Sequence, residues 1–390
     1  MGRPRVLVTC FPQSGHLHPL IPIARALADA GCPVLVATAA SQHALLEGVG
    51  LEAVHLGPSH EETISGLGGL RSEALAALPS DRRAILFSSL FGKVYAPAIA
   101  DELLARARSW QADVLLAGLE SLAGPLVAAQ LGLPLVVSGF GTGLAENVCD
   151  AATWAVAPLW ERAGLAVPAA AGLLGGLFVD PCPPSLRPDD VSPPSDRQSI
   201  RPAQFDGVGS VPPLPTRRPL VYITFGTNPV FATPTRLRTL AEAVASTGAA
   251  AVITGLEARA LGPLPEDVRA HPFVPQSALL PHCDAVICHG GASTFFGALA
   301  HGLPLLLVPL GADHFANAAA AVRRGVGVVL DDAVDASSVE AAVARLLTDR
   351  ELRSSAAEVA EEIAAMPSPD EAADGVLAWL AGRSGPRVSS

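Results

Sequence analysis

A glycine-rich segment in the second half of the chain combines residue types that can bind phosphate. The run His289–Asn317 starts where a predicted strand ends, continues through two glycines and opens a helix near Ser293. Glycines let the backbone approach a ligand closely, and Ser293 and Thr294 can supply hydroxyl groups in the first helical turn. The free amides and the dipole of a helix N-terminus attract anions, so this arrangement favours a phosphate site. The residues expected there are His289, Gly290, Gly291, Ser293 and Thr294.

A second turn, one strand later, carries different chemistry. The strand predicted over Pro304–Val308 is followed by a turn, and Asp313 and His314 then open a helix. A carboxylate at this rim would accept hydrogen bonds from hydroxyl groups rather than bind phosphate. Phosphate at one strand end and a hydroxyl-rich group at the next together describe a nucleotide sugar.

His16 is the candidate base in the first half of the chain. It lies in a predicted loop between the strand Arg5–Cys10 and the helix Pro19–Ala30, so we expect it to point from the carboxyl end of that strand into the cleft between the two halves. A neutral imidazole there could take the proton of an acceptor hydroxyl. His18 directly precedes the proline at the helix entry, and we interpret it as structural or as lining the acceptor site.

The elements that position these residues alternate between strand and helix in both halves. This pattern predicts an α/β protein with two doubly wound, Rossmann-like domains facing across a cleft, in which ligands lie beyond the carboxyl ends of the strands. The proline-rich stretch Asp180–Pro219 cannot continue a helix or a central strand, so it is interpreted as the connection. The stretch over Gly57–Leu78 is predicted to be less regular. The predicted parts are residues 1–205 for the acceptor, 206–218 as linker, 219–366 for the nucleotide sugar and 367–390 as a C-terminal helix returning to the first domain.

Composition excludes several classes of protein. Of the 390 residues, 50% are apolar and 16% charged, and the net charge of −11 argues against nucleic acid as a partner. Neither a secretory signal nor an apolar run long enough to span a bilayer is visible, so we expect a cytoplasmic protein without a membrane role. The six scattered cysteines are predicted to be buried, reduced thiols. His271, His282 and His289 lack the spacing of zinc ligands, and we expect no metal or other cofactor.

Five short motifs occur in order along the chain: GHLHP at Gly15–Pro19, TFGT at Thr224–Thr227, VPQ at Val274–Gln276, HGGAST at His289–Thr294 and PLGADHFANA at Pro309–Ala318. With these motifs the chain resembles glycosyltransferase family 1, which has the GT-B fold, and most of all its bacterial branch that decorates polyketides and other natural products. The resemblance covers nearly the whole chain. It implies inverting, metal-independent transfer of a sugar from a TDP- or UDP-sugar to a hydroxyl group of a small apolar aglycone, with a deoxysugar as one candidate.

The resemblance also implies roles for single residues. Gly226 and Thr227 would approach the diphosphate, and Phe273, Val274 and Gln276 would hold the base. Asp313 and His314 would face the sugar hydroxyls. The family usually has Gln where this chain has His314, which leaves the sugar open.

His16 occupies the position of the family's general base. Relatives often place an acid at the end of the strand over Asp113–Ala117, where this chain has Gly118, and Glu120 is the best substitute. A solvated loop or helix-cap acid is the alternative interpretation of Glu120. The acceptor site would be lined by His18, Phe87, Phe91, Phe140 and Trp154, with core packing as the alternative for these aromatic residues.

Two other functions remain open at this stage. One is a GT-B nucleotide-sugar epimerase, against which the GHLHP motif argues. The other is a catalytically silent partner of another transferase, although such a protein could lose His16 or the phosphate motif and this chain has both. The sequence leaves the choice between uracil and thymine open, and it is compatible with a homodimer.

Overall fold

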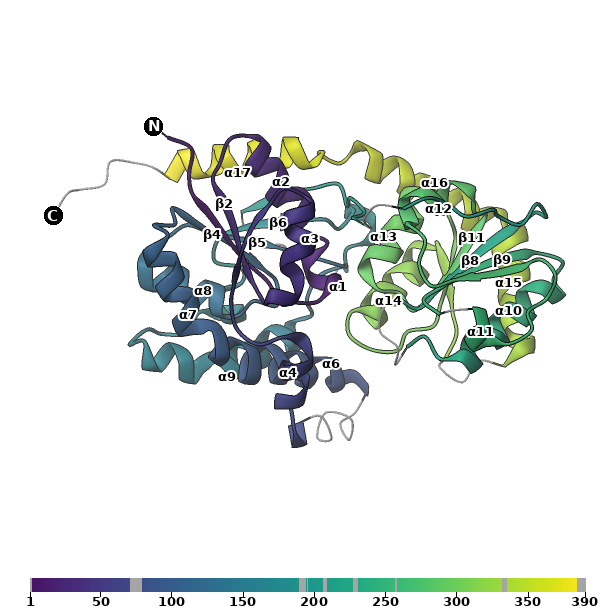
Figure 1. Ribbon diagram of the computed structural model, residues 1–390, viewed down its shortest axis with the longest axis horizontal. Helices are drawn as coiled ribbons and strands as arrows, with labels where there is room; N and C mark the ends of the chain where they lie inside the picture. The colour runs from purple at the N-terminus through teal and green to yellow at the C-terminus, as the bar shows by residue number, and fades with distance from the viewer. Residues whose placement is uncertain are drawn as a thin grey trace. The chain divides into compact units, whose positions relative to one another are not determined.

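The computed structural model describes residues 2–70, 79–188, 194, 196–205, 209–226, 231–256, 258–331 and 335–383. The chain forms two compact units. The first comprises Met1–Pro181, Asp189–Arg201 and Pro367–Ser390, and the second comprises Cys182–Pro188 and Pro202–Met366. Each unit contains one parallel sheet with helices on both faces (Figure 1).

The first unit is built on a seven-stranded parallel sheet of order β3-β2-β1-β4-β5-β6-β7. Its strands are β1 (Val6–Thr9), β2 (Val34–Thr38), β3 (Glu52–His55), β4 (Val114–Gly118), β5 (Leu135–Ser138), β6 (Leu177–Asp180) and β7 (Arg197–Ser199). Its helices are α1 (Ser14–Leu17), α2 (Ile21–Asp29), α3 (His43–Gly48), α4 (His60–Gly66), α6 (Pro79–Phe87), α7 (Ala96–Ser109), α8 (Ala123–Leu131), α9 (Glu146–Arg162) and α17 (Pro369–Arg383). Shorter turns are the π-helix η2 (Ser88–Tyr95) and the 3-10 helices η1 (Ala40–Gln42) and η3 (Ala169–Gly172).

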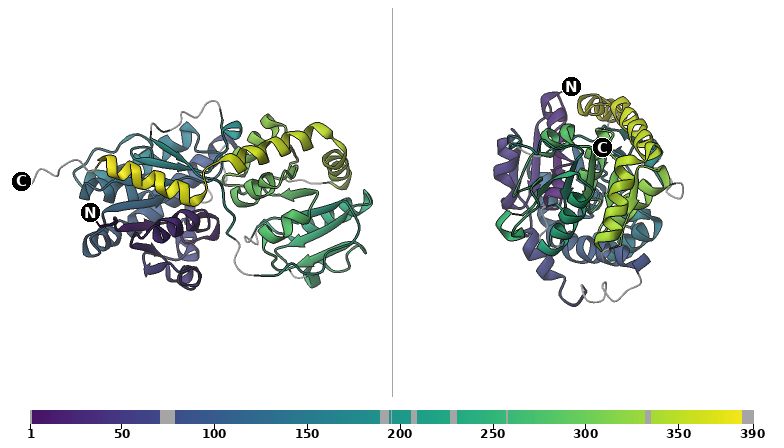
Figure 2. Two further views of the ribbon diagram at one scale, coloured as in Figure 1. Left: turned by 90° about the horizontal axis from the view of Figure 1, so that it is seen from above. Right: turned by 90° about the vertical axis from the view of Figure 1, so that its right-hand side faces the viewer.

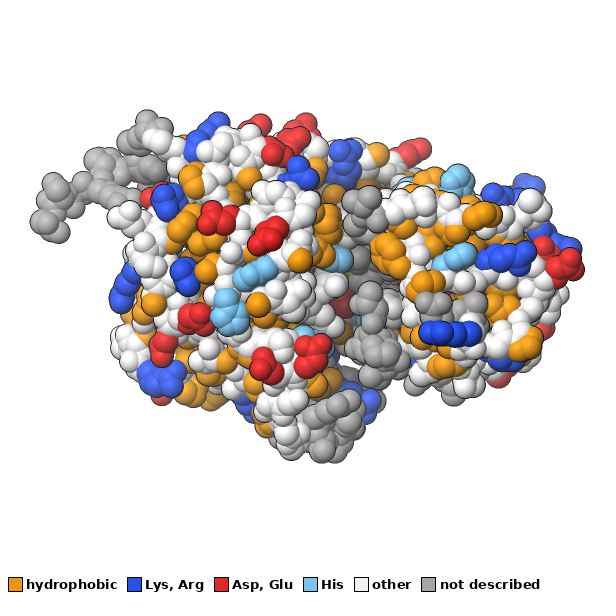
Figure 3. Space-filling view, viewed as in Figure 1, with side chains coloured by type: hydrophobic (Ala, Val, Ile, Leu, Met, Phe, Trp, Pro, Cys, Tyr) orange, Lys and Arg blue, Asp and Glu red, His pale blue; other side chains and the backbone are white. Residues whose placement is uncertain are grey.

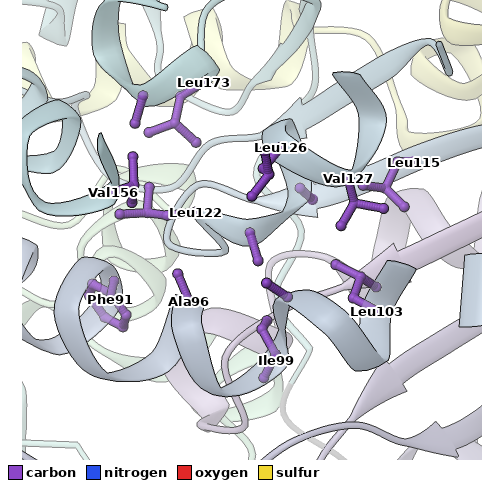
Figure 4. Packing of buried hydrophobic residues seen from close by; sticks show 14 of the residues in the cluster. Phe91, Ala96, Ile99, Leu103, Leu115, Leu122, Leu126, Val127, Val156 and Leu173 are labelled. Carbon is purple, nitrogen blue, oxygen red and sulfur yellow. The ribbon is translucent and has the colours of Figure 1, made fainter. Parts of the chain in front are cut away.

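The core of this unit follows from continuous apolar strands. Successive side chains of a strand point to opposite faces, so a parallel sheet covered by helices on both sides needs apolar residues at every position. Leu7 and Leu115 point to the face covered by η2, α7, α8 and α9, where Ile99, Leu103 and Leu126 pack against them (Figure 4).

The second unit has a six-stranded parallel sheet of order β10-β9-β8-β11-β12-β13. Its strands are β8 (Leu220–Thr224), β9 (Ala250–Thr254), β10 (Val268–His271), β11 (Ala285–Cys288), β12 (Leu305–Leu307) and β13 (Gly327–Val329). Its helices are α10 (Pro234–Ser246), α11 (Ala258–Leu261), α12 (Gln276–Leu279), α13 (Ala292–Ala300), α14 (His314–Arg324), α15 (Ala336–Thr348) and α16 (Arg350–Ala365), with the 3-10 helices η4 (Pro184–Leu186) and η5 (Leu280–His282).

The last helix, α17, belongs to the first unit. It packs against α2, and Figure 2 shows it beside the N-terminal part of the chain. The Trp379 indole N–H donates to the Asp196 carboxylate at 2.9 Å, and the Arg201 amide donates to the Pro367 carbonyl at 2.7 Å. These hydrogen bonds connect α17 to the segment around β7.

Three local predictions were wrong. His16 lies in the short helix α1 rather than in a loop. The stretch predicted to be less regular contains α4, which Ser59 and Glu62 cap reciprocally through their side chains and backbone amides; residues 71–78 of that stretch lie outside the described residues. The proline-rich connection contains β7, which fits because it is a short edge strand that ends before Pro202.

On the face of the first unit seen in Figure 3, acidic and basic side chains are interspersed rather than separated by sign. None of the helices that the structure describes is long and apolar enough to cross a membrane. All six cysteines are free; five of them are buried as the sequence predicted, whereas Cys149 is half-buried.

Candidate functional site

The first cluster of polar residues lies where the sheet of the first unit reverses its strand order. From β1 the chain continues to β2 and β3 on one side and then returns to β4 on the other, so β1 and β4 are neighbours with Thr9 beside Ala117. In doubly wound sheets ligands bind at the carboxyl ends of the strands that flank such a reversal. His16 follows β1 and Glu120 follows β4, so the topology brings both to this point.

Glu120 is fully buried, which contradicts the alternative of a solvated loop acid. Its Oε1 accepts a hydrogen bond from the Phe11 amide at 2.9 Å. Its Oε2 lies 3.5 Å from Nδ1 of His16, and neither of these two atoms has a closer polar partner among the described residues. A buried carboxylate requires such partners, because burial without them is costly. The pair therefore orients the His16 ring with Nδ1 toward Glu120 and Nε2 away from it.

Aromatic rings surround the His16 side chain, which is 16% exposed. The rings of Phe11, Phe91 and Phe140 lie edge-on to it, with centroids at 5.5, 5.4 and 5.1 Å. Phe87 extends the group through Phe91 at 4.9 Å. The structure thus places Phe91 and Phe140 beside the candidate base. Phe87 and Phe91 are also buried in the core of the first unit, in agreement with the alternative of core packing.

The other two predicted acceptor residues lie differently. His18 is half-buried at the C-cap of α1. Trp154 is 81% exposed on α9, so the structure does not bring it into the aromatic group around His16.

Sequence analysis missed His60, which lies beside this cluster. Its ring is edge-on to Phe11 at 5.5 Å, on the first turn of α4. Desolvation by burial lowers the pKa of His60, and the nearby His16 lowers it further. The capping-box pattern Ser59–Glu62 would have predicted the helix start, but no sequence signal placed this histidine near His16.

The second cluster lies at the equivalent reversal in the second unit, between β8 and β11, where Thr224 pairs with Cys288. Gly226 and Gly290 follow these strands with φ of 72° and 90°, values that favour glycine. A Cβ atom on Gly226 would lie 3.1 Å from the His289 ring, and one on Gly291 would lie 2.6 Å from its Nε2. The glycines therefore make room for the imidazole as well as for close approach of a ligand.

His289 is a neutral histidine. Desolvation by burial, with His314 next to it, lowers its pKa from 6.5 to about 3. The His289 and His314 rings are perpendicular with centroids 4.4 Å apart, and Phe231 stacks on His289 at 5.9 Å. At physiological pH His289 can therefore form a hydrogen bond with an anion, but it carries no positive charge.

Asp313 and His314 hold the turns around this point. Oδ2 of Asp313 accepts from the Ala292 amide at 3.2 Å and from the Asn317 side chain at 2.8 Å. Nδ1 of His314 accepts from the amides of Leu310 and Gly311 at 3.3 and 3.2 Å, which places its proton on Nε2. Oδ1 of Asp313 is the atom that these contacts leave for other partners.

The segment predicted to hold the base combines an exposed ring with buried supports. Phe273 is 56% exposed, whereas Val274 is buried. The side-chain Nε2 of Gln276 donates to the Thr294 hydroxyl at 3.1 Å in the first turn of α13. Thr227, predicted to approach the diphosphate, lies outside the described residues. Among the residues that are described, no three His, Cys, Asp or Glu side chains group together as metal ligands would.

Comparisons with known proteins agree with this arrangement. Residues 25–213 match the family described as erythromycin biosynthesis protein CIII-like, N-terminal domain, and residues 238–379 match its C-terminal domain. The elloramycin glycosyltransferase ElmGT of Streptomyces olivaceus is 33% identical over 95% of this chain and 96% of its own length. The L-demethylnoviosyl transferase of Streptomyces niveus is 33% identical over 96% and 98%.

A solved structure extends the likeness to the whole fold. The crystal structure of the Streptomyces sp. SF2575 glycosyltransferase SsfS6, complexed with thymidine diphosphate, superposes with a TM-score of 0.79. It is 29% identical and covers 96% of this chain and 99% of its own. Together with the two parallel sheets, this match confirms the predicted GT-B fold.

Proposed function

This chain belongs to the erythromycin biosynthesis protein CIII-like family of bacterial natural-product glycosyltransferases, and from that premise we propose that it transfers a sugar, with inversion, from a nucleoside diphosphate to a hydroxyl group of a small apolar aglycone. We propose thymidine diphosphate as the carrier and a deoxysugar as the transferred group. The support for the carrier is the thymidine diphosphate bound to SsfS6. The support for the sugar is the aclacinomycin-T 2-deoxy-L-fucose transferase of Streptomyces galilaeus, which is 28% identical over 94% of this chain.

The observation that carries the proposal is the His16–Glu120 pair. With Nδ1 turned to the buried carboxylate at 3.5 Å, Nε2 is the nitrogen with a free lone pair. The acceptor hydroxyl gives its proton to Nε2 while its oxygen forms a bond to the anomeric carbon. The bond from that carbon to the diphosphate breaks on the opposite face, and its electron pair leaves with the nucleoside diphosphate. Glu120 stabilises the imidazolium that results.

The aromatic surroundings of His16 support an apolar acceptor. Phe91 and Phe140 place apolar surface beside the base, and such surface binds a planar or aliphatic aglycone by the hydrophobic effect. A charged acceptor would lose its hydration there without gaining a partner.

The second unit supports the donor role without a metal. The Ala292 amide at the start of α13 donates to Asp313, whereas the N-cap Gly291 makes no side-chain hydrogen bond to the amides that follow, so those amides and the Thr294 hydroxyl are available to an anion. These groups would stabilise the charge that grows on the leaving diphosphate.

Thermal unfolding with thymidine and uridine diphosphates, each with magnesium or with a chelator, tests the donor site. We expect thymidine diphosphate to raise the melting temperature equally in both conditions, because a ligand that binds only the folded state stabilises it by about 2.7 kcal/mol at a hundred times its Kd. Turnover of a TDP-sugar by the purified chain with an aglycone, and the anomeric configuration of the product, test the reaction. Turnover only after addition of another transferase, or retention of configuration, would contradict the proposal.

A further inference from the structure

A glutamine in the segment that precedes β8 packs against the helix of the proposed phosphate site. The side-chain Nε2 of Gln204 lies 3.3 Å from the Ser293 carbonyl oxygen and 3.3 Å from Oε1 of Gln276. It lies over Gly297 in the middle of α13, where any Cβ atom would overlap the Gln204 amide group. An alanine would stabilise the helix interior more than glycine does, so this glycine makes room for Gln204.

The carbonyl oxygen of Ser293 fixes the direction of a short chain of hydrogen bonds. A backbone carbonyl can only accept, so Gln204 must turn its NH₂ group toward it. The same NH₂ group then meets Oε1 of Gln276, and Gln276 must present its own NH₂ group to Thr294, to which it donates at 3.1 Å. The opposite orientation of Gln204 would set its Oε1 against the carbonyl oxygen.

This direction determines what the Thr294 hydroxyl can do. Its oxygen accepts from Gln276, so its proton is left for another acceptor, and the described part of the chain supplies none. Thr294 lies in the first turn of α13, where the proposed function puts the diphosphate. In this orientation Oε1 of Gln204 is buried without a partner among the described residues, so the orientation carries the cost of one unpaired oxygen.

We infer that Gln204 is a positioning residue for the diphosphate: through Gln276 it keeps the Thr294 hydroxyl as a hydrogen-bond donor directed at the ligand. The inference rests on the proposed function, because it concerns the orientation of one donor within that phosphate site. It assigns a role in donor binding to the segment that leads from the first unit into the second.

The substitution Gln204→Glu reverses the chain of hydrogen bonds. A carboxylate only accepts, so residue 204 loses its hydrogen bond to the Ser293 carbonyl. It can keep its bond to Gln276 only if Gln276 turns its NH₂ group toward residue 204 and its Oε1 toward Thr294, which then donates to Gln276 instead of to the ligand. We expect calorimetry to show about a tenfold or greater loss in affinity for thymidine diphosphate, as for a lost hydrogen bond to a charged group. Affinity for thymidine, which carries no phosphate, should fall less, because only the diphosphate would accept from the Thr294 hydroxyl.

A double-mutant cycle separates this effect from the added charge. In a Thr294→Val background the hydroxyl is absent, so Gln204→Glu should have no further effect on diphosphate affinity. Gly297→Ala tests the same contact independently, because its methyl group displaces the Gln204 side-chain amide without changing any polar group. It should also lower the affinity for thymidine diphosphate. Combined with Gln204→Ala, it should cause no further loss of affinity. Gln198→Glu is the matched control, since Gln198 packs over Gly375 of α17 in the same manner but in the first unit.

Failure of the proposed function and failure of the role of Gln204 give different results in these measurements. If the unaltered protein does not bind thymidine diphosphate, the proposed function fails. If it binds, and Gln204→Glu and Gly297→Ala both leave the affinity unchanged, the role of Gln204 is overturned. A loss that persists in the Thr294→Val background, or that affects thymidine equally, overturns it as well, because the effect then does not pass through the hydroxyl.

Discussion

The carboxylate of Glu120 occupies the space that a side chain at Gly118 would fill. A Cβ atom added to Gly118 would lie 2.6 Å from Oε1 and 2.9 Å from Oε2 of Glu120. Gly118 is the last residue of β4, at the edge of the sheet where His16 follows β1. An acid two residues beyond the strand therefore reaches the position that an acid at the end of the strand would reach directly.

This relationship predicts that the acid can be moved. Glu120→Ala should lower the turnover number, because the imidazolium formed at His16 loses its buried counter-charge. Gly118→Asp alone should fold poorly, because two carboxylates would compete for one buried space. The double variant Gly118→Asp/Glu120→Ala should be more active and melt at a higher temperature than Gly118→Asp. Turnover of the double variant no higher than that of Glu120→Ala would show that Glu120 does not act on His16 from this position.

His16→Ala should lower the turnover number by about 10²–10⁴-fold, the usual contribution of a general base. Its affinity for thymidine diphosphate should remain unchanged, since the proposed donor site lies in the other unit. Steady-state kinetics and calorimetry measure the two quantities. His55→Ala, which replaces an exposed histidine on β3, serves as the control. A rate close to that of the control would rule His16 out as the base.

The central strands and the order of the motifs could be predicted from the sequence, because parallel strands covered on both faces are continuous apolar runs. The helix α9 was missed, since Pro158 lies inside it and prolines usually mark helix ends. The edge strand β7 has no apolar run to reveal it, because its residues are only partly buried.

In the candidate site, too, some positions could be predicted from the sequence and others could not. The position of His16 followed from its place after a strand, whereas the burial of Glu120 depends on the Phe11 amide, a contact between residues 109 positions apart. The contacts of Asp313 and His314 with backbone amides likewise depend on turn geometry that no spacing rule contains.

His289 should make the stability of the second unit sensitive to acid. Its pKa is about 3 in the folded chain, whereas a histidine exposed to water has a pKa of 6.5, so between these pH values the unfolded chain binds a proton that the folded chain does not. The free energy of unfolding should therefore fall as the pH drops from 6.5 toward 3, by up to about 1.4 kcal/mol per pH unit from this residue. Denaturant unfolding measures the free energy of unfolding at about pH 7 and at about pH 4. The difference between these two values should be smaller for His289→Gln than for the unaltered protein. An equal difference in both proteins would mean that His289 is not buried in its neutral form.

His314 offers a test of what selects the sugar. Its Nδ1 holds the amides of Leu310 and Gly311, and a glutamine oxygen could accept from the same amides. We therefore expect His314→Gln to keep the melting temperature and the affinity for thymidine diphosphate but to change the ratio of kcat/KM between TDP-sugars. His314→Leu should lose about 1–3 kcal/mol of stability, because it leaves buried amides without an acceptor. Unchanged sugar preference in a well-folded His314→Gln variant would confine His314 to holding the turn, and the choice of sugar would then fall to other residues around Asp313.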